Sequence, residues 1–347
     1  MQDSQGSQSS STLDEASAGT RSGRSRPKSS SRRASSASSR AASQRALVNL
    51  NIIKLMDDFP EERCRIVLEH LRWPEGIRCI RCESEKVSRI YDRDQYDCDS
   101  CRYRFSVTSG TMMHDTHLSL RKWFVATFLM CESKKGISSL QLQRTLGVAY
   151  RTAWYLTHRI RAAMGQNERP MLTGTVEADE TWVGGKRKHV GSGYIENKVQ
   201  VLGAIERGGD IRLAVHGKGT RANTANLHAF LRSVVSDDAP AIYTDENPGY
   251  RGIADEDTIH ATVNHRDEEW VRGDVHTNTA ESAWSLFKRS LVGSYHQLSV
   301  KHLDAYLGEF EWRFNNRENP FLFRDTLGSL MRAESMPYKE LTADGVA

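Results

Sequence analysis

The sequence predicts a multidomain α/β protein, and three observations support that prediction. Two Cys-x-x-Cys pairs lie close together between residues 79 and 101. Apolar residues recur at helical spacing before them and again over 118–164. From Thr175 onward the pattern changes to short alternating strands interrupted by single helices. We therefore expect a metal-binding module, a helical segment and a larger α/β domain.

The length of 347 residues allows two or three domains. No stretch approaches the roughly 18 uninterrupted apolar residues of a membrane span, and the N-terminus has no apolar signal core. These features exclude an integral membrane protein and disfavour a secreted one, so we expect a cytoplasmic location and no membrane partner.

The first 46 residues form the first predicted segment, a disordered tail. Residues 1–45 hold sixteen Ser, and seven Arg and one Lys stand against three acidic residues. Such a composition buries too little apolar area to order the chain. The tail is either a basic arm that touches phosphates, a solvated extension, or an extension from an unused start site. Because the whole chain has a net charge of only +4, the rest is nearly neutral, and any nucleic-acid binding there requires local basic patches.

Five further segments follow the tail. They are an N-terminal helical segment (47–73), a Cys-rich segment (74–112), a helical segment (113–168), an α/β domain (172–335) and a C-terminal tail (336–347). The boundaries follow changes in apolar periodicity and the positions of Gly and Pro.

The Cys-rich segment predicts a zinc ribbon. Cys79 and Cys82 form one knuckle, Cys98 and Cys101 form the other, and fifteen residues separate them. Two such knuckles can converge on one tetrahedral Zn²⁺. Four thiolates close the site, so we expect one structural ion, although the ligands alone also allow iron. The remaining cysteines, Cys64 and Cys131, lie in apolar helical patterns and are expected in the core.

The helical segment predicts a helix-turn-helix layout. Ser138 or Ser139 can cap a first helix, Gly147 suits the turn, and a second helix begins near Tyr150. Arg151 and Arg159 on the second helix are candidate DNA contacts. The alternative is an ordinary helical hairpin whose charged residues form a solvated face.

The α/β domain shows a recognisable order of elements. Three strand candidates (175–183, 198–205 and 211–216) precede a helix (225–235), a strand (241–245), a helical turn (250–253), a strand (260–263) and two helices (279–291 and 300–314). This is the order of the ribonuclease H-like fold, in which flanking helices cover a mixed five-stranded sheet.

Three acids occupy the positions where that fold holds its metal ligands. Asp179 lies in the first strand, Asp245 ends the fourth, and Glu281 lies in the first turn of a late helix. Carboxylates suit Mg²⁺ or Mn²⁺, and two such ions can hold an in-line phosphoryl displacement.

Several of these positions also have structural interpretations. Glu281 with Asn278 fits a helix-capping box instead. Lys288, on the same helical stripe, is either a phosphate contact or an exposed lysine. Glu177 shares the strand face of Asp179, Glu180 points the other way, and either is a candidate secondary acid.

The chain resembles the DDE transposases of the insertion-sequence 1595 family, in its XO2-like branch. The motifs that carry the resemblance are the two Cys pairs and the strings Phe105–Thr111, Ser133–Ile137, Glu177–Lys186, Tyr243–Glu246, His276–Arg289 and Arg313–Arg317. The resemblance implies a zinc ribbon, a helical DNA reader and a ribonuclease H-like domain whose catalytic residues are Asp179, Asp245 and Glu281, with Lys288 as a helper. The Ser/Arg-rich N-terminus departs from the family pattern.

The predicted function is transposition, with cleavage at the element ends and strand transfer into target DNA. The expected partners are the terminal inverted repeats and target DNA, held by a homodimer or larger assembly at the nucleoid. Further candidate DNA contacts are Lys186, Arg187, Lys188 and Arg289. Two alternatives are a non-catalytic DNA-binding regulator derived from a transposase and a structure-selective nuclease of the same fold.

Overall fold

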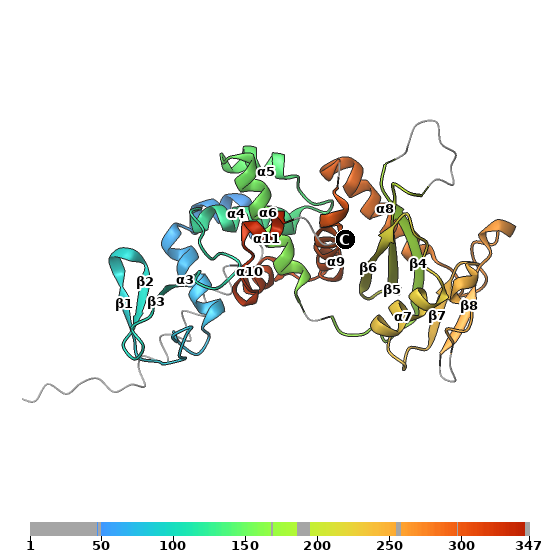
Figure 1. Cartoon of the computed structure of the whole chain (residues 1–347), viewed down its shortest axis with the longest axis horizontal. Coiled ribbons are helices and arrows are strands. Elements are labelled where there is room, and N and C mark those ends of the chain that lie inside the picture. The colour runs from blue at the N-terminus through green and yellow to red at the C-terminus, as the bar shows by residue number, and fades with distance from the viewer. Residues whose placement is uncertain are drawn as a thin grey trace, which may run out of the picture. The chain divides into compact units, whose positions relative to one another are not determined.

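The computed structural model describes residues 47, 50–167, 169–185, 195–254, 258–296 and 298–343 (Figure 1). The predicted disordered tail (1–46) and the last four residues lie outside these ranges. Within the described ranges, no helix combines the length and the apolar composition needed to cross a membrane.

Two helices lead into the predicted ribbon. They are α2 (Ile52–Asp58) and α3 (Glu61–Arg72), and the antiparallel strands that follow are β1 (Val87–Ile90), β2 (Gln95–Cys98) and β3 (Arg104–Ser106). Trp73 contacts the rings of Tyr96 and Phe105 edge-on, at centroid distances of 5.8 and 5.9 Å. Arg72 donates to the Val107 carbonyl at 2.6 Å. These contacts fix the small sheet against the end of α3.

A layer of helices follows the ribbon. Its members are α4 (Leu120–Glu132), α5 (Ser139–Leu146) and α6 (Tyr150–Gly165). Together with α2 and α3 they enclose one core, in which Cys64 and Cys131 are buried as expected. Ser138 caps α5, and Gly147 ends it at φ 60°, in the left-handed region that favours glycine. The predicted layout of two helices joined by a glycine turn is confirmed, while its binding to DNA stays a prediction.

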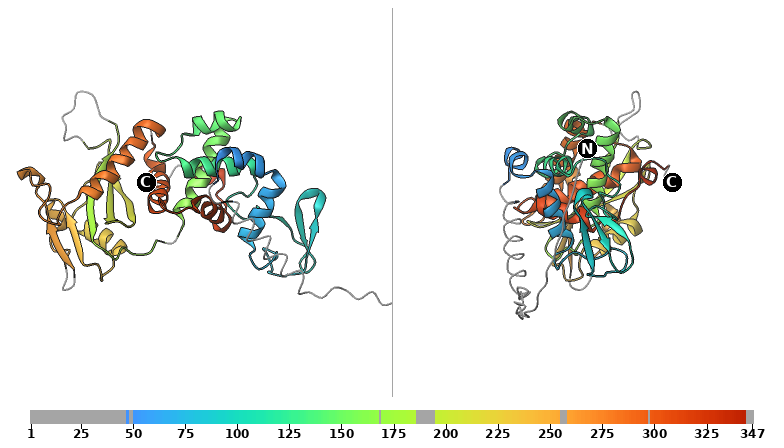
Figure 2. Two further views of the ribbon diagram at one scale, coloured as in Figure 1. Left: turned by 180° about the vertical axis from the view of Figure 1, so that it is seen from behind. Right: turned by 90° about the vertical axis from the view of Figure 1, so that its left-hand side faces the viewer.

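The α/β domain is built on a mixed sheet with the strand order β6-β5-β4-β7-β8. The strands are β4 (Val176–Val183), β5 (Val199–Glu206), β6 (Ile211–Lys218), β7 (Ala241–Thr244) and β8 (Ile259–Thr262). The first three pair antiparallel, whereas β7 runs parallel to β4 and β8 runs parallel to β7. This order confirms the predicted ribonuclease H-like fold, and Figure 2 shows the sheet from two further directions.

Different helices cover the two faces of this sheet. One face packs against α8 (Asn278–Ser290) and α9 (Leu303–Asn315), with Val199, Val201 and Trp284 in a common core. The other packs against α7 (Thr224–Val234). Because side chains alternate along a strand, Asp179 points toward the α8 face and Glu180 toward the α7 face.

Helices α6 and α9 are joined by a buried ion pair. Arg161 donates from Nε to Glu309 Oε2 at 2.6 Å, and both side chains are fully buried. Tyr295 donates its hydroxyl to Glu309 Oε1 at 2.9 Å. Gly136 lies so close that a Cβ there would be 1.6 Å from the Tyr295 hydroxyl, which accounts for the glycine in the 133–137 motif. Removing one partner of such a pair leaves an uncompensated buried charge and is strongly destabilising.

The C-terminal helices return to the helical layer. Helix α10 (Leu322–Arg332), which the sequence placed in the 172–335 domain, packs against α3, α4 and α6. It supplies Phe323, Leu327 and Leu330 to the helical core. The short α11 (Tyr338–Thr342) lies in the predicted tail. An amphipathic pattern shows that a helix has an apolar face but not which neighbour covers it, so the packing divides the chain differently from the sequence boundaries.

Candidate active site

Four cysteine thiols converge in the ribbon. The Sγ atoms of Cys79, Cys82, Cys98 and Cys101 all lie within 4.8 Å of one another. Backbone N–H groups of Cys101 and Ser100 lower the pKa of the Cys98 thiol to about 7. Burial and neighbouring thiols raise the pKa values of Cys82 and Cys101 instead, so a bound cation would stabilise their thiolates, the form that binds zinc. The cluster therefore fits the predicted tetrahedral structural zinc.

The two knuckles are built alike. Glu83 donates its N–H to the Cys79 carbonyl at 2.9 Å, and Arg102 donates to the Cys98 carbonyl at 2.8 Å. Both donors take a left-handed φ, of 57° and 60°. The same local turn thus presents each pair of thiols.

Asp179 and Asp245 meet at the centre of the large sheet. Strands β4 and β7 pair in parallel with Glu177 beside Tyr243. Two residues further along each strand, Asp179 comes level with Asp245, which directly follows β7. Strand register therefore brings two of the three predicted acids together.

Burial makes the ionised forms of Asp179 and Asp245 unfavourable. Burial, together with the charges of Asp245 and Glu180, raises the pKa of Asp179 to about 7. Burial also raises the pKa values of Asp245 and Glu180. A divalent cation would stabilise their ionised forms, and oxygen is the ligand that Mg²⁺ and Mn²⁺ prefer. The residues present fit such an ion.

Glu180 completes the acid cluster from the opposite face of β4. Its Oε1 accepts the side-chain N–H of Asn247 at 3.0 Å, and its carboxylate also accepts the hydroxyl of Tyr250. Asn247 in turn donates its backbone N–H to Asp245 Oδ1 at 3.0 Å. Glu180 thereby fixes the loop that carries Asp245.

Glu177, the other candidate secondary acid, has a structural role. Its buried carboxylate accepts the backbone N–H groups of Thr279 and Ala280, at 2.7 and 3.1 Å, and so caps α8. Arg207 donates to it at 2.7 Å, and His276 Nδ1 lies 3.1 Å away. Glu177 therefore holds the start of α8 on the sheet.

Glu281 lies in the first turn of α8 and is half exposed. The helix begins after Thr277, whose side chain makes no cap bond, and the cap comes from Glu177. The alternative capping box with Asn278 is therefore wrong. Glu281 Oε1 lies 3.8 Å from His265 Nε2. Among the described residues, the three predicted acids are not gathered as tightly as the cysteines are.

A groove of about 580 Å³ extends from the acids along α8. Its lining includes Asp179, Glu180 and Glu281, and further along α8 it includes the exposed cations Lys288 and Arg289. Gly203 and Trp284 pack closely beneath it: a Cβ on Gly203 would lie 2.5 Å from the indole. The groove brings Asp179, Glu281 and Lys288 to one surface.

Residues 171–315 match the family model described as the ISXO2-like transposase domain, and residues 60–104 match the transposase zinc-ribbon domain. The chain is 30% identical over 274 residues to an uncharacterized protein in transposable element ISH50 of Halobacterium salinarum, covering 73% of this chain and 90% of that protein. This chain belongs to the insertion-sequence 1595 family of transposases. The recognition from sequence motifs is confirmed.

Solved structures with weak similarity to this transposase include two Mos1 complexes. The pre-cleavage Mos1 transpososome is 13% identical with a TM-score of 0.25, covering 60% of this chain and 79% of that chain. The Mos1 strand transfer complex is 13% identical with a TM-score of 0.26, covering 60% and 74%. The ribonuclease H-like fold is assigned from the strand order β6-β5-β4-β7-β8 and not from these similarities.

The candidate DNA contacts of the transposase differ in their exposure to solvent. Arg159 is 4% exposed and donates to the His114 carbonyl at 2.6 Å, so the prediction that it contacts DNA is wrong. Arg151 is exposed at the start of α6, above the Tyr338 ring at 4.2 Å. Lys186, Arg187 and Lys188 lie outside the described residues. Arg151 and Arg289 remain candidates.

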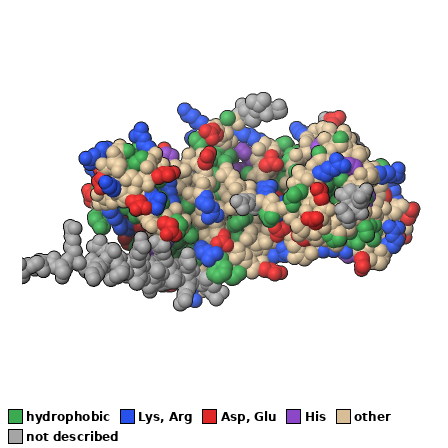
Figure 3. All heavy atoms as spheres, turned by 90° about the horizontal axis from the view of Figure 1, so that it is seen from below, with side chains coloured by type: hydrophobic (Ala, Val, Ile, Leu, Met, Phe, Trp, Pro, Cys, Tyr) green, Lys and Arg blue, Asp and Glu red, His purple; other side chains and the backbone are tan. Residues whose placement is uncertain are grey.

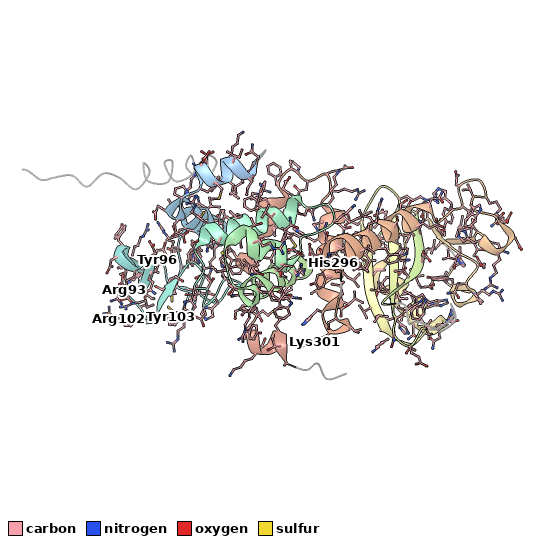
Figure 4. The ribbon with its side chains drawn as sticks, turned by 90° about the horizontal axis from the view of Figure 1, so that it is seen from above. Arg93, Tyr96, Arg102, Tyr103, His296 and Lys301 are labelled. Carbon is pink, nitrogen blue, oxygen red and sulfur yellow. The ribbon has the colours of Figure 1, made fainter. Side chains whose placement is uncertain are left out.

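Basic residues on the ribbon add further candidates. Arg93 is exposed in the turn between β1 and β2, and Arg102 is exposed directly after the second cysteine knuckle. Figure 4 shows both residues with Tyr103 on this module. On the face shown in Figure 3, Lys and Arg side chains are interspersed with acidic ones. The face shown therefore carries no single basic field.

His265 lies at the acid site of the transposase, although the sequence alone does not mark it. It lies in a turn after β8, and its Nε2 is 3.8 Å from Glu281 and 3.3 Å from Thr277 Oγ1. No metal-ligand spacing marks this residue in the sequence. The available signal was topological, because the segment from β8 to α8 passes beside the end of β7.

Proposed function

We propose that this transposase cleaves DNA strands at the ends of its element and joins the freed 3′-hydroxyls to target DNA. The observation that supports this most directly is the Asp179–Asp245 pair, whose ionisation is disfavoured in the protein alone. Asp179 of this pair lines a groove together with Lys288 and Arg289. Phosphodiester chemistry requires acids that bind divalent metal ions and basic side chains that contact phosphates. Both kinds of residue lie at this site.

Two divalent ions, when bound, activate the attacking oxygen and stabilise the leaving oxygen. Asp179 and Asp245 would hold them from the sheet, and Glu281 would leave His265 to complete the ligand set. Lys288, two turns along α8, would contact a phosphate of the bound strand.

The reaction is two successive displacements at phosphorus. Water attacks the scissile phosphodiester, and the bond from phosphorus to the 3′-oxygen breaks, which leaves a 3′-hydroxyl and a 5′-phosphate. That 3′-hydroxyl then attacks a phosphodiester of the target and displaces the target's own 3′-oxygen. One bond forms and one breaks in each step, so strand transfer needs no other reactant.

DNA recognition is assigned to the ribbon and to the exposed first turn of α6. Phosphate contacts from residues such as Arg93, Arg102 and Arg151 would set the register, and a few base contacts would set specificity. Joining two element ends to one target requires both ends in one complex, so we propose a homodimer or larger assembly.

Strand transfer tests the proposal. Zinc-loaded protein is incubated with the flanking inverted-repeat DNA, a plasmid target and Mg²⁺ or Mn²⁺. We expect joined product from the wild type, loss of at least about 10³-fold in Asp245→Asn, and wild-type rates in Asp237→Asn, an exposed acid before β7.

Three outcomes would contradict the proposal. Equal rates in Asp245→Asn would refute the assigned mechanism. Tight binding of the ends without product under either metal would favour a DNA-binding regulator. Cleavage of branched duplexes without any joining would favour a nuclease.

A further inference from the structure

An exposed tryptophan stands at the edge of the acid cluster. Trp270 is 55% exposed, and the adjacent Val271 is 52% exposed. Both lie between the turn that carries His265 and a β-bridge that pairs Arg272 with Val275. An indole is among the largest apolar groups in a protein, and it is usually covered by the fold or by a ligand.

Trp270 is tied to the acid site through His265. The two rings lie 4.7 Å apart at an interplanar angle of 54°. On its other side, His265 Nε2 lies 3.8 Å from Glu281 Oε1. An aromatic surface therefore borders the position where the scissile phosphate would be held.

The segment around Trp270 carries both signs of charge, with the cations Arg266 and Arg272 near the exposed acids Asp267 and Glu268. Arg272 is 57% exposed and donates to the Thr262 carbonyl at 2.8 Å. Arg266, which is 84% exposed, pairs with Glu246 at 3.2 Å. On the other side of Glu281, the groove continues to Lys288 and Arg289. A DNA strand could thus contact cations on both sides of the acids.

We propose that Trp270 stacks on a DNA base that has left the duplex next to the cleaved phosphodiester, and that it thereby positions this phosphodiester. Within a duplex, both faces of a base are covered by its neighbours, so an indole reaches a base face only where the stack is opened, and a base extruded beside the scissile bond offers such a face. Aromatic stacking of this kind is tolerant of base identity, which suits an enzyme that must handle both element ends. The inference rests on the proposed function.

Fluorescence of 2-aminopurine tests this proposal directly. The probe is placed at each of three positions on either side of the cleavage site that the strand-transfer assay maps. Measurements use saturating protein in the Asp245→Asn background, so that the strand stays intact. In the Trp270→Ala form of this background, we expect a several-fold rise in fluorescence at one position when the DNA binds, because the extruded base then has no stacking partner. With Trp270 present, stacking on the indole should keep the emission at that position low.

Variants of Trp270 then identify the stacking partner. In Trp270→Ala, we expect the fluorescence signature at that position to change and cleavage by the otherwise wild-type protein to slow on the order of 10-fold. Trp270→Phe should restore both towards wild type. Ile259→Ala is the matched control, because Ile259 is 66% exposed in the same domain but lies at the opposite end of β8.

The outcomes separate this inference from the proposed function. Wild-type cleavage and unchanged fluorescence in Trp270→Ala would overturn the role of Trp270 and leave the function standing. An absence of any cleavage by the wild type, with end binding intact, would instead refute the function. Equal slowing in Trp270→Ala and Ile259→Ala would also overturn the proposal, because the effect would then not be specific to the ring.

Discussion

The cysteine cluster and the acid cluster differ in how closely their ligands are gathered. The four thiols lie within 4.8 Å of one another and come from two short turns of the same build. The acids come from two strands and a helix, and Glu281 is 3.8 Å from His265. A structural site can be assembled by local chain geometry. The proposed acid site depends on packing between distant elements, which leaves Glu281 apart from the two aspartates.

The largest expected effect concerns the ribbon. Structural zinc contributes about 10–16 kcal/mol of apparent binding energy in small zinc modules. Cys98→Ser should therefore lose the ion and unfold residues 74–106, which zinc analysis and hydrogen exchange would detect. Cys64→Ala, which removes a buried thiol outside the cluster, should keep one zinc per chain. A protected ribbon in Cys98→Ser would show that the metal does not organise it.

A smaller effect is expected from pH at the acid cluster. The folded protein holds the Asp179 proton up to about pH 7, whereas the ordinary pKa is 3.8. Between these values the folded state binds more protons than the unfolded state, so stability falls as pH rises. With zinc but without Mg²⁺, the free energy of unfolding should fall by up to about 4 kcal/mol from pH 4 to 8.

Two comparisons isolate this effect. Denaturant titrations of Asp179→Asn should show a flatter pH dependence, and Mg²⁺ should raise the stability of the wild type most at high pH. If neither Asp179→Asn nor Mg²⁺ altered the slope of the free energy of unfolding against pH, the evidence that these acids need a cation would be lost.

A third comparison distinguishes an acid that stabilises α8 from an acid on α8 that is proposed to take part in cleavage. Glu177→Gln should lower the free energy of unfolding by about 3 kcal/mol, because it breaks a buried ion pair and weakens the helix cap. Glu281→Gln, half exposed on the same helix, should change stability by less than about 0.5 kcal/mol yet abolish cleavage. Thermal melts and cleavage rates of both variants check this contrast, and equal melting temperatures would contradict it.

Much of the fold could be predicted because alternation and helical spacing are local properties. The five strands and their helices follow the predicted order within a few residues. The register of β4 and β7 then brings Asp179 and Asp245 together. The cysteine knuckles could be predicted for the same reason, since their spacing in the sequence determines their geometry.

Features that depend on tertiary neighbours could not be predicted. Arg159 has the spacing of a helix-surface residue, but α6 is covered along most of its length and the guanidinium is enclosed. Glu177 resembles a second catalytic acid until α8 is placed above it. His265 acquires its partner only when the segment after β8 folds back beside Glu281.

The packing of α10 has a consequence for how such proteins can be recombined. The polypeptide leaves the helical core after α6 and re-enters it with α10, whose Phe323, Leu327 and Leu330 complete that core. Topologically, the α/β domain is an insertion within the helical half. A chimera that joins residues 1–170 to another nuclease would leave this core open. A functional exchange has to carry α10 as well, so the helical half is inherited in two separate stretches of coding sequence.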